Sequence, residues 1–163
     1  MTDFHIEDDP VVHQITAVAA KKKSNARAYV APQPGHDELR DRYLATAPPI
    51  LHTRLKFYRY DETLGVWASI EDMLIEAEIL KMIERAKGEN VRVTAPLLSS
   101  VTKLTKVKTA IDGARLDAEP DLLVCGNGTL HIPTRDLREF SPDHYATTRV
   151  SYNYDPEATC PAF

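Results

Sequence analysis

The sequence has few cysteines, no long apolar run and no basic leader. Its two cysteines, Cys125 and Cys160, stand far apart and form no CxxC pair, so neither a disulfide framework nor a zinc knuckle is indicated. No apolar run approaches the roughly 18–20 residues that cross a bilayer. The first ten residues include four acids, whereas a signal peptide begins with basic residues. These absences favour a cytoplasmic protein in a reducing compartment.

The local motifs of common catalytic sites are also missing. The sequence has no Walker loop, the glycine-rich phosphate loop that ends in Gly-Lys-Ser or Gly-Lys-Thr, so ATP hydrolysis by that mechanism is excluded for this chain. It has no G-x-S-x-G motif, and Cys125 has no basic or histidine neighbour in sequence. The six histidines do not follow the spacings H-x-E or H-E-x-x-H. We therefore expect no catalysis, no metal site and no cofactor in this chain.

Charge is unevenly distributed, although the net charge is only −4. Residues 1–36 start with acids, continue with the basic run at 21–23 and end in Pro32-Gln33-Pro34-Gly35. Opposed charge blocks with few large apolar residues bury too little surface to offset chain entropy. We predict a flexible tail or linker at residues 1–36 and a folded domain at residues 37–163. A docked helix around residues 11–20 is the alternative.

Two β-hairpins and one short helix are expected from local patterns. A helix capped by Asp37 carries Leu39, Tyr43 and Leu44, and ends at residues 48–49, which are both proline. An aromatic hairpin is predicted over residues 55–60 and 66–68. A second hairpin is predicted over residues 122–125 and 129–132, around a Gly-Asn-Gly turn.

A pair of helices is expected between the hairpins. Ser69 and Asp72 have the spacing of a capping box, and a helix is predicted to follow up to a stop at Gly88. Its apolar face is expected to consist of Ile70, Met73, Leu74, Ala77, Leu80 and Ile83. A second helix opens at Thr94, with Pro96 in its first turn, and ends near Gly113. The expected fold class is α+β, a single small domain in which two hairpins flank the helical pair.

Basic residues are concentrated on the second predicted helix. Residues 90–111 contain no Asp or Glu and carry four cations: Arg92, Lys103, Lys106 and Lys108. Lys103 and Lys106 share the polar side with Ser99, Thr102 and Thr109, and such groups donate hydrogen bonds to phosphate. We predict that these cations contact DNA. The ordinary alternative is a solvated helix face, and Lys108, nearer the apolar stripe, can simply snorkel.

The aromatic hairpin suggests a second kind of contact with nucleic acid. Tyr58, Tyr60 and Trp67 can stack on unpaired bases beside a basic patch, as in single-strand binders that tolerate any sequence. Aromatic residues on hairpins more often pack in the core or across strands, which is the alternative.

The order of several short segments resembles a known family. The segments, with the helical pair between the second and third, are 57–61 (FYRYD), 65–67 (GVW), 127–130 (NGTL), 141–145 (SPDHY) and 154–161 (YDPEATCP). They resemble the domain that directly precedes the superfamily 3 helicase motor in phage, plasmid and poxvirus-type primase–helicases, over about residues 37–163. One departure is that the family often has an acid shortly after the Asn-Gly turn, where this chain has residues 131–133 (HIP).

The resemblance implies a module of a ring-forming, ATP-driven DNA-unwinding protein of a phage or other mobile element. Its partners would be single-stranded or forked DNA without sequence preference, a helicase motor domain and further copies of the chain. ATP and Mg²⁺ would be bound by the motor of a longer parent, often with a primase upstream. We expect a non-catalytic DNA-contacting and coupling or assembly module; the alternative is a stand-alone protein-interaction or oligomerisation module. The end at Phe163, where the motor would begin, suggests a cut piece or a gene for this domain alone.

Overall fold

The computed structural model of the chain describes residues 33–86 and 90–158. The flexible tail predicted for residues 1–36 lies outside this range except for its last four residues. Of these, Pro34 is buried and His36 is the first residue of a helix. The described residues belong to one unit, which begins at Gln33.

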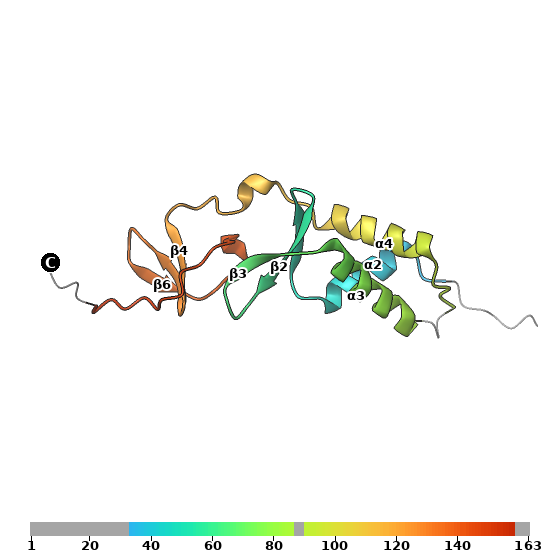
Figure 1. Cartoon of the computed structure of the whole chain (residues 1–163), viewed down its shortest axis with the longest axis horizontal. Helices are drawn as coiled ribbons and strands as arrows, with labels where there is room; N and C mark the ends of the chain where they lie inside the picture. The colour runs from blue at the N-terminus through green and yellow to red at the C-terminus, as the bar shows by residue number, and fades with distance from the viewer. Residues whose placement is uncertain (1–32, 87–89, 159–163) are drawn as a thin grey trace, which may run out of the picture. The chain divides into compact units, whose positions relative to one another are not determined.

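Three helices and a three-stranded antiparallel sheet form the first part of this unit (Figure 1). In chain order they are α2 (His36–Thr46), β1 (Ile50–Thr53), β2 (Lys56–Asp61), β3 (Val66–Ile70), α3 (Asp72–Arg85) and α4 (Ala95–Lys108). The strand order is β1-β2-β3. Helix α4 contacts both α2 and α3, so the three helices pack together beside the sheet.

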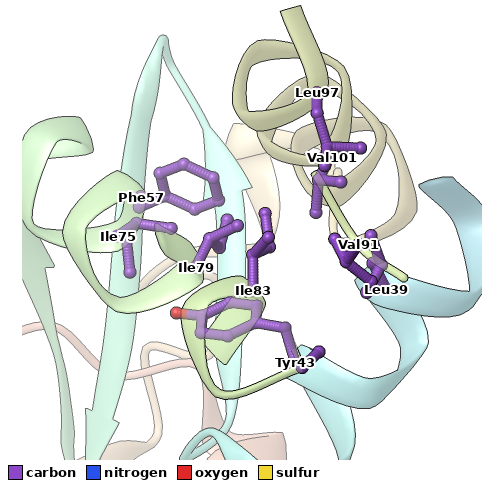
Figure 2. Packing of buried hydrophobic residues seen from close by; sticks show 10 residues of the cluster. Leu39, Tyr43, Phe57, Ile75, Ile79, Ile83, Val91, Leu97 and Val101 are labelled. Atoms are coloured by element: carbon purple, nitrogen blue, oxygen red, sulfur yellow. The ribbon is translucent and has the colours of Figure 1, made fainter. Parts of the chain in front are cut away.

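The core lies between these helices and β2. Ile75, Ile79 and Ile83 are four residues apart, so they share one face of α3, and all three are fully buried. Burying one such side chain contributes about 1.5–3 kcal/mol to stability. Figure 2 shows this face together with the residues that complete the cluster, which are Leu39 and Tyr43 of α2, Phe57 of β2, Val91, and Leu97 and Val101 of α4.

A second three-stranded antiparallel sheet follows the helices. Its strands are β4 (Leu122–Cys125), β5 (Gly128–His131) and β6 (Asp136–Arg138), in the order β4-β5-β6. The chain then returns along β4, because Val150 N donates to Val124 O at 2.9 Å and Gly126 N donates to Tyr152 O at 2.7 Å. Single 3₁₀ turns, Gly113–Arg115 and Pro142–His144, precede and follow this sheet.

Contacts of Trp67 join the first sheet to the segment after β6. Its Nε1 donates to the Pro142 carbonyl at 2.9 Å, and its ring stacks on Tyr145 with centroids 6.4 Å apart. Gly65, at φ +71°, lies so close to Phe140 that a Cβ would stand 2.2 Å from the Phe140 ring. Only glycine therefore fits at this position.

The expected α+β fold with hairpins that flank a helical pair is confirmed, and each hairpin gains a third strand. Strand β1 has four residues and directly follows two prolines, and β6 has three residues that are all exposed. Burial alternates along β1, but its residue types do not, because two apolar residues are followed by His52 and Thr53; the three residues of β6 show no alternation.

The starts and ends of the helices differ from the expectation in three places. Gly35, not Asp37, is the N-cap of α2. Ser69 does not cap α3, because it pairs with Tyr58 as part of β3. Helix α4 begins at Thr94 as expected, where the hydroxyl accepts from Leu97 N at 3.3 Å. It ends at Lys108 rather than near Gly113, because the following residues pair with β1.

Candidate nucleic-acid interface

The lysines of α4 do not form one face. On an α-helix, residues three apart differ by about 60° and residues five apart by about 140° in direction. Lys103 and Lys108 are exposed, and Lys106 is half-buried. Lys103 and Lys106 therefore lie on neighbouring sides, whereas Lys108 points to another flank of the helix.

Lys106 is engaged within the fold. Its Nζ lies 2.5 Å from Oδ2 of Asp72, the first residue of α3, and 5.7 Å from the centroid of the Phe57 ring. Both side chains of the ion pair are about a third exposed, so the pair stabilises the fold by only about 0–1 kcal/mol. Asp72 nevertheless compensates the charge of Lys106. A phosphate contact by Lys106 would have to compete with this carboxylate.

The hydroxyl groups expected beside these lysines are only partly available. Thr102 is buried at 3% exposure, so it does not point to solvent as expected. The Thr109 hydroxyl donates to the Thr105 carbonyl at 2.9 Å. Of Ser99, Thr102 and Thr109, only Ser99 is exposed. The predicted set of phosphate donors on α4 is therefore reduced.

Arg92 and Lys108 are exposed at opposite ends of the α4 region. Lys108 faces α2, where it contributes to the low pKa of Asp41. The pKa of that carboxyl lies below its ordinary value chiefly because Arg40 donates hydrogen bonds to it, and only to a smaller extent because of Lys108. Lys108 and Lys103 thus lie on different surfaces of the domain.

The aromatic residues proposed for base stacking are part of the core. Tyr60 and Trp67 are each 5% exposed and belong to one buried cluster with Leu51 and Leu116. Tyr58 is half-buried and packs against the same cluster. The faces of Tyr60 and Trp67 are covered, so the prediction that these two rings stack on bases is wrong. The sequence did not distinguish stacking on bases from packing in the core, because the segment that covers Trp67 lies 75 residues further along the chain.

The turn between β1 and β2 was not singled out from the sequence. Arg54 and Leu55 form its two central residues, and Thr53 pairs with Lys56 across it. All three of Arg54, Leu55 and Lys56 are exposed. The sequence gives little sign of this turn, because residues 54–56 are Arg-Leu-Lys, without the glycine or asparagine that two-residue turns favour.

Backbone hydrogen bonds hold this turn beside the end of α4. His52 N donates to the Thr109 carbonyl at 2.9 Å, and Ile111 N donates to the His52 carbonyl at 3.1 Å. The Arg54 guanidinium donates to the Gly113 carbonyl at 2.8 Å. In Figure 1 the β1–β2 turn accordingly stands next to the segment that leaves α4. Two cations of the turn thus lie at the same end of the domain as the lysines of α4.

A groove lies elsewhere, between the end of α2 and the face of β2 and β3. It has a volume of about 710 Å³, and a neighbouring cavity of about 440 Å³ shares Thr46, Ala47 and Pro48 with it. Arg59 lines the groove and pairs with Glu78 at 2.6 Å, and the Tyr43 hydroxyl donates to the same carboxylate at 2.8 Å. Burial and this carboxylate raise the pKa of Tyr43.

Other chemistry has little support in the part of the chain that the structure describes. These residues contain no group of three or more His, Cys, Asp or Glu side chains placed to hold a metal ion. Burial raises the pKa of the Cys125 thiol, which disfavours the nucleophilic thiolate. In residues 33–86 and 90–158, no helix is both long and apolar enough to span a bilayer.

The fold is a small α+β domain in which several of the short segments that suggested a family contact one another. The GVW and SPDHY segments touch through Trp67, and the NGTL and YDPEATCP segments touch through Asn127, which exchanges two hydrogen bonds with the Tyr154 backbone.

A family model described as "D5 N terminal like" matches residues 38–163, which is most of the chain. The chain belongs to this family, the N-terminal domains of D5-like primase–helicase proteins of phage and poxvirus type. A search of curated proteins found no match.

Proposed function

We propose that this domain is a non-catalytic DNA-contacting and coupling module of a primase–helicase. It guides a strand along the end of the domain where the β1–β2 turn meets α4. The observation that carries the proposal is that three cations of the β1–β2 turn and of α4, Arg54, Lys56 and Lys103, are exposed and form no ion pair with an acid within the described residues. Family membership supplies the replication context.

The proposed contacts are to phosphates and carry little base information. Side chains of Lys and Arg that contact phosphates position a protein on DNA, whereas sequence is read at base edges. A strand-guiding module needs the first kind of contact, because it must accept any sequence. Arg92 and Lys108 lie away from this surface, and Lys106 contributes less because Asp72 already compensates its charge.

Salt dependence tests this proposal. Each phosphate contact on a single strand lowers log K by about 0.7 per unit of log salt, so three contacts give a slope near 2. Lys103→Ala should flatten the slope by about 0.7 and lower the affinity similarly for unrelated sequences. Lys106→Ala should change the slope less. Fluorescence anisotropy with a labelled oligonucleotide at several salt concentrations measures both quantities.

Lys81→Ala is the matched control, because Lys81 is also an exposed helical lysine but lies on α3. Exposed substitutions of this kind alter stability by no more than about 0.5 kcal/mol, so Lys103→Ala and Lys81→Ala should melt like the wild type. Lys106→Ala should cost up to about 1 kcal/mol, because it removes the ion pair with Asp72. A wild-type domain that binds no DNA at low salt, or a Lys103→Ala variant with the wild-type slope, overturns the proposal.

The second candidate function is a protein-interaction or assembly module, which the groove beside Arg59 favours. Arg59 Nε is buried there and has no hydrogen-bond partner among the described residues. This groove fits a partner domain or another copy of the chain, as in a ring of motor subunits. In that case DNA binding would be absent, and sedimentation would show association that Arg59→Ala weakens. If the chain is part of a longer parent, the motor of that parent would bind ATP and Mg²⁺ under either candidate; a stand-alone interaction module would need neither.

A further inference from the structure

We propose that Leu55 is an apolar wedge that packs on the last base pair of a junction between duplex and single-stranded DNA. The inference rests on the proposed DNA contact and deepens it, because it names a junction rather than a single strand as the preferred ligand. It makes the β1–β2 turn the part of the domain that meets the fork.

Leu55 is the most exposed large apolar side chain in the described part of the chain, at 89%. A single exposed leucine is ordinary on a protein surface. The backbone at this position is not ordinary, because Arg54 and Leu55 adopt φ values of +49° and +65°. Tight hairpins of this kind favour Asn-Gly at the two central positions, since other side chains strain the left-handed backbone. Folding alone therefore does not account for a leucine here.

The turn holds Leu55 in a fixed position. The β1 and β2 strands pair in register up to Thr53 and Lys56, directly beside the turn, and Thr53 is buried at 5%. Arg54 is tied to Gly113, and His52 is tied on both sides to the segment that follows α4. A side chain on such a braced turn loses little freedom when it binds.

The charges around Leu55 favour DNA over an apolar protein pocket. Arg54 and Lys56 flank it in sequence, both are exposed, and neither is paired with an acid in residues 33–86 and 90–158. Glu71 and Asp72 lie near Lys56, since all three line one cavity, and Asp72 is paired with Lys106. Proteins that insert an apolar side chain between bases surround it with cations that bind the adjacent phosphates.

The size of the feature favours the end of a duplex over an internal step. Insertion between stacked base pairs requires unstacking, and proteins repay that cost with bends that wrap a large surface. Here one leucine stands between two cations. The terminal base pair of a junction offers an open apolar face without unstacking, so one side chain is sufficient to cover it.

Binding to three DNA ligands tests the wedge in the full chain. The ligands are a fork with 2-aminopurine in the terminal base pair, a single strand of the same sequence and a blunt duplex. We expect the wild type to prefer the fork to the single strand and to change the 2-aminopurine fluorescence. Leu55→Asn should lower fork affinity by about fivefold, the loss expected from part of one leucine burial. Affinity for the single strand and its salt slope should stay unchanged.

Leu55→Asn should also raise the melting temperature by about 3 °C, because asparagine tolerates the left-handed backbone. A more stable variant with weaker fork binding separates the wedge from a folding defect. Leu55→Met should retain the fork preference. Leu64→Asn is the matched control, because Leu64 is an exposed leucine in the turn at the other end of β2, and it should bind the fork like the wild type.

Three outcomes would overturn the wedge. An unchanged fork preference in Leu55→Asn, together with a flattened salt slope in Lys103→Ala, refutes the wedge and leaves the DNA-contact proposal standing. Self-association of the wild type that Leu55→Asn abolishes, without a change in fork binding, assigns the turn to a protein contact. A wild-type chain that binds none of the three ligands refutes both proposals.

Discussion

The helical region (residues 33–111) and the second-sheet region (residues 112–158) are held together in different ways. Most of the fully buried side chains belong to the helical region, whereas Val124 and Thr129 are the examples from the second-sheet region. The second-sheet region is held mainly by individual polar and aromatic contacts, such as those of Trp67 and Asn127. Four of the segments that suggested the family, 65–67, 127–130, 141–145 and 154–161, take part in these contacts, and none of them includes Arg54, Lys56 or Lys103.

The largest effect is expected in the core of the helical region. Ile79→Ala should lower the free energy of unfolding by about 2–5 kcal/mol, because it leaves a cavity at a fully buried position. Chemical denaturation measures this loss. Leu74→Ala on the same helix is the control, since Leu74 is 53% exposed, and it should cost far less. Equal losses in the two variants would show that α3 does not pack as described.

A smaller and more local effect is expected at the junction where Trp67 contacts the segment after β6. Trp67→Phe removes the hydrogen bond to the Pro142 carbonyl, 2.9 Å long in the wild type, and keeps an aromatic ring against Tyr145. The loss should be about 1–3 kcal/mol, because the partly buried carbonyl loses its donor. Hydrogen exchange should accelerate around residues 140–146 more than in α3. Equal acceleration of hydrogen exchange in both regions would show that the junction does not act locally on the second-sheet region.

The smallest effect is expected at the edge of the second sheet. Asn127→Ala removes two hydrogen bonds to the Tyr154 backbone, of 2.8 and 3.0 Å. Because the site is exposed, the global loss should be only about 0.5–1.5 kcal/mol. Limited proteolysis should nevertheless cut faster around residues 150–158. The exposed neighbour Asn153, changed to Ala, is the control and should leave the cutting rate unchanged.

The sequence predicted the parts of the fold that depend on local periodicity. Apolar periodicity marks α3, Thr94 marks the start of α4, and the Gly126–Asn127 turn marks the second hairpin. The buried face of α3 was predicted wrongly, because Met73 and Leu74 of the expected face are exposed and Ile75 and Ile79 are buried instead. Strands β1 and β6 were not predicted, because the residue types of neither strand alternate between apolar and polar in a way that reveals the buried side. The family was identified because the order of its segments survives in the linear sequence.

The candidate site was predicted only in part, because its geometry depends on distant residues. The ion pair between Lys106 and Asp72 cannot be predicted from local sequence, because Asp72 lies 34 residues earlier. Leu55 reads as one more apolar residue in a strand until the turn places it at an exposed tip. Lys103 alone of the three α4 lysines keeps the expected character, an exposed cation on the outer side of the helix.

Hydrogen exchange with and without a DNA fork reports on both regions in one experiment. If the domain contacts DNA through the β1–β2 turn and the end of α4, residues 53–57 and 103–111 should gain protection. Strands β4, β5 and β6 should be unchanged. Protection centred on the second sheet, or no protection anywhere under conditions of saturated binding, would rule out this DNA contact.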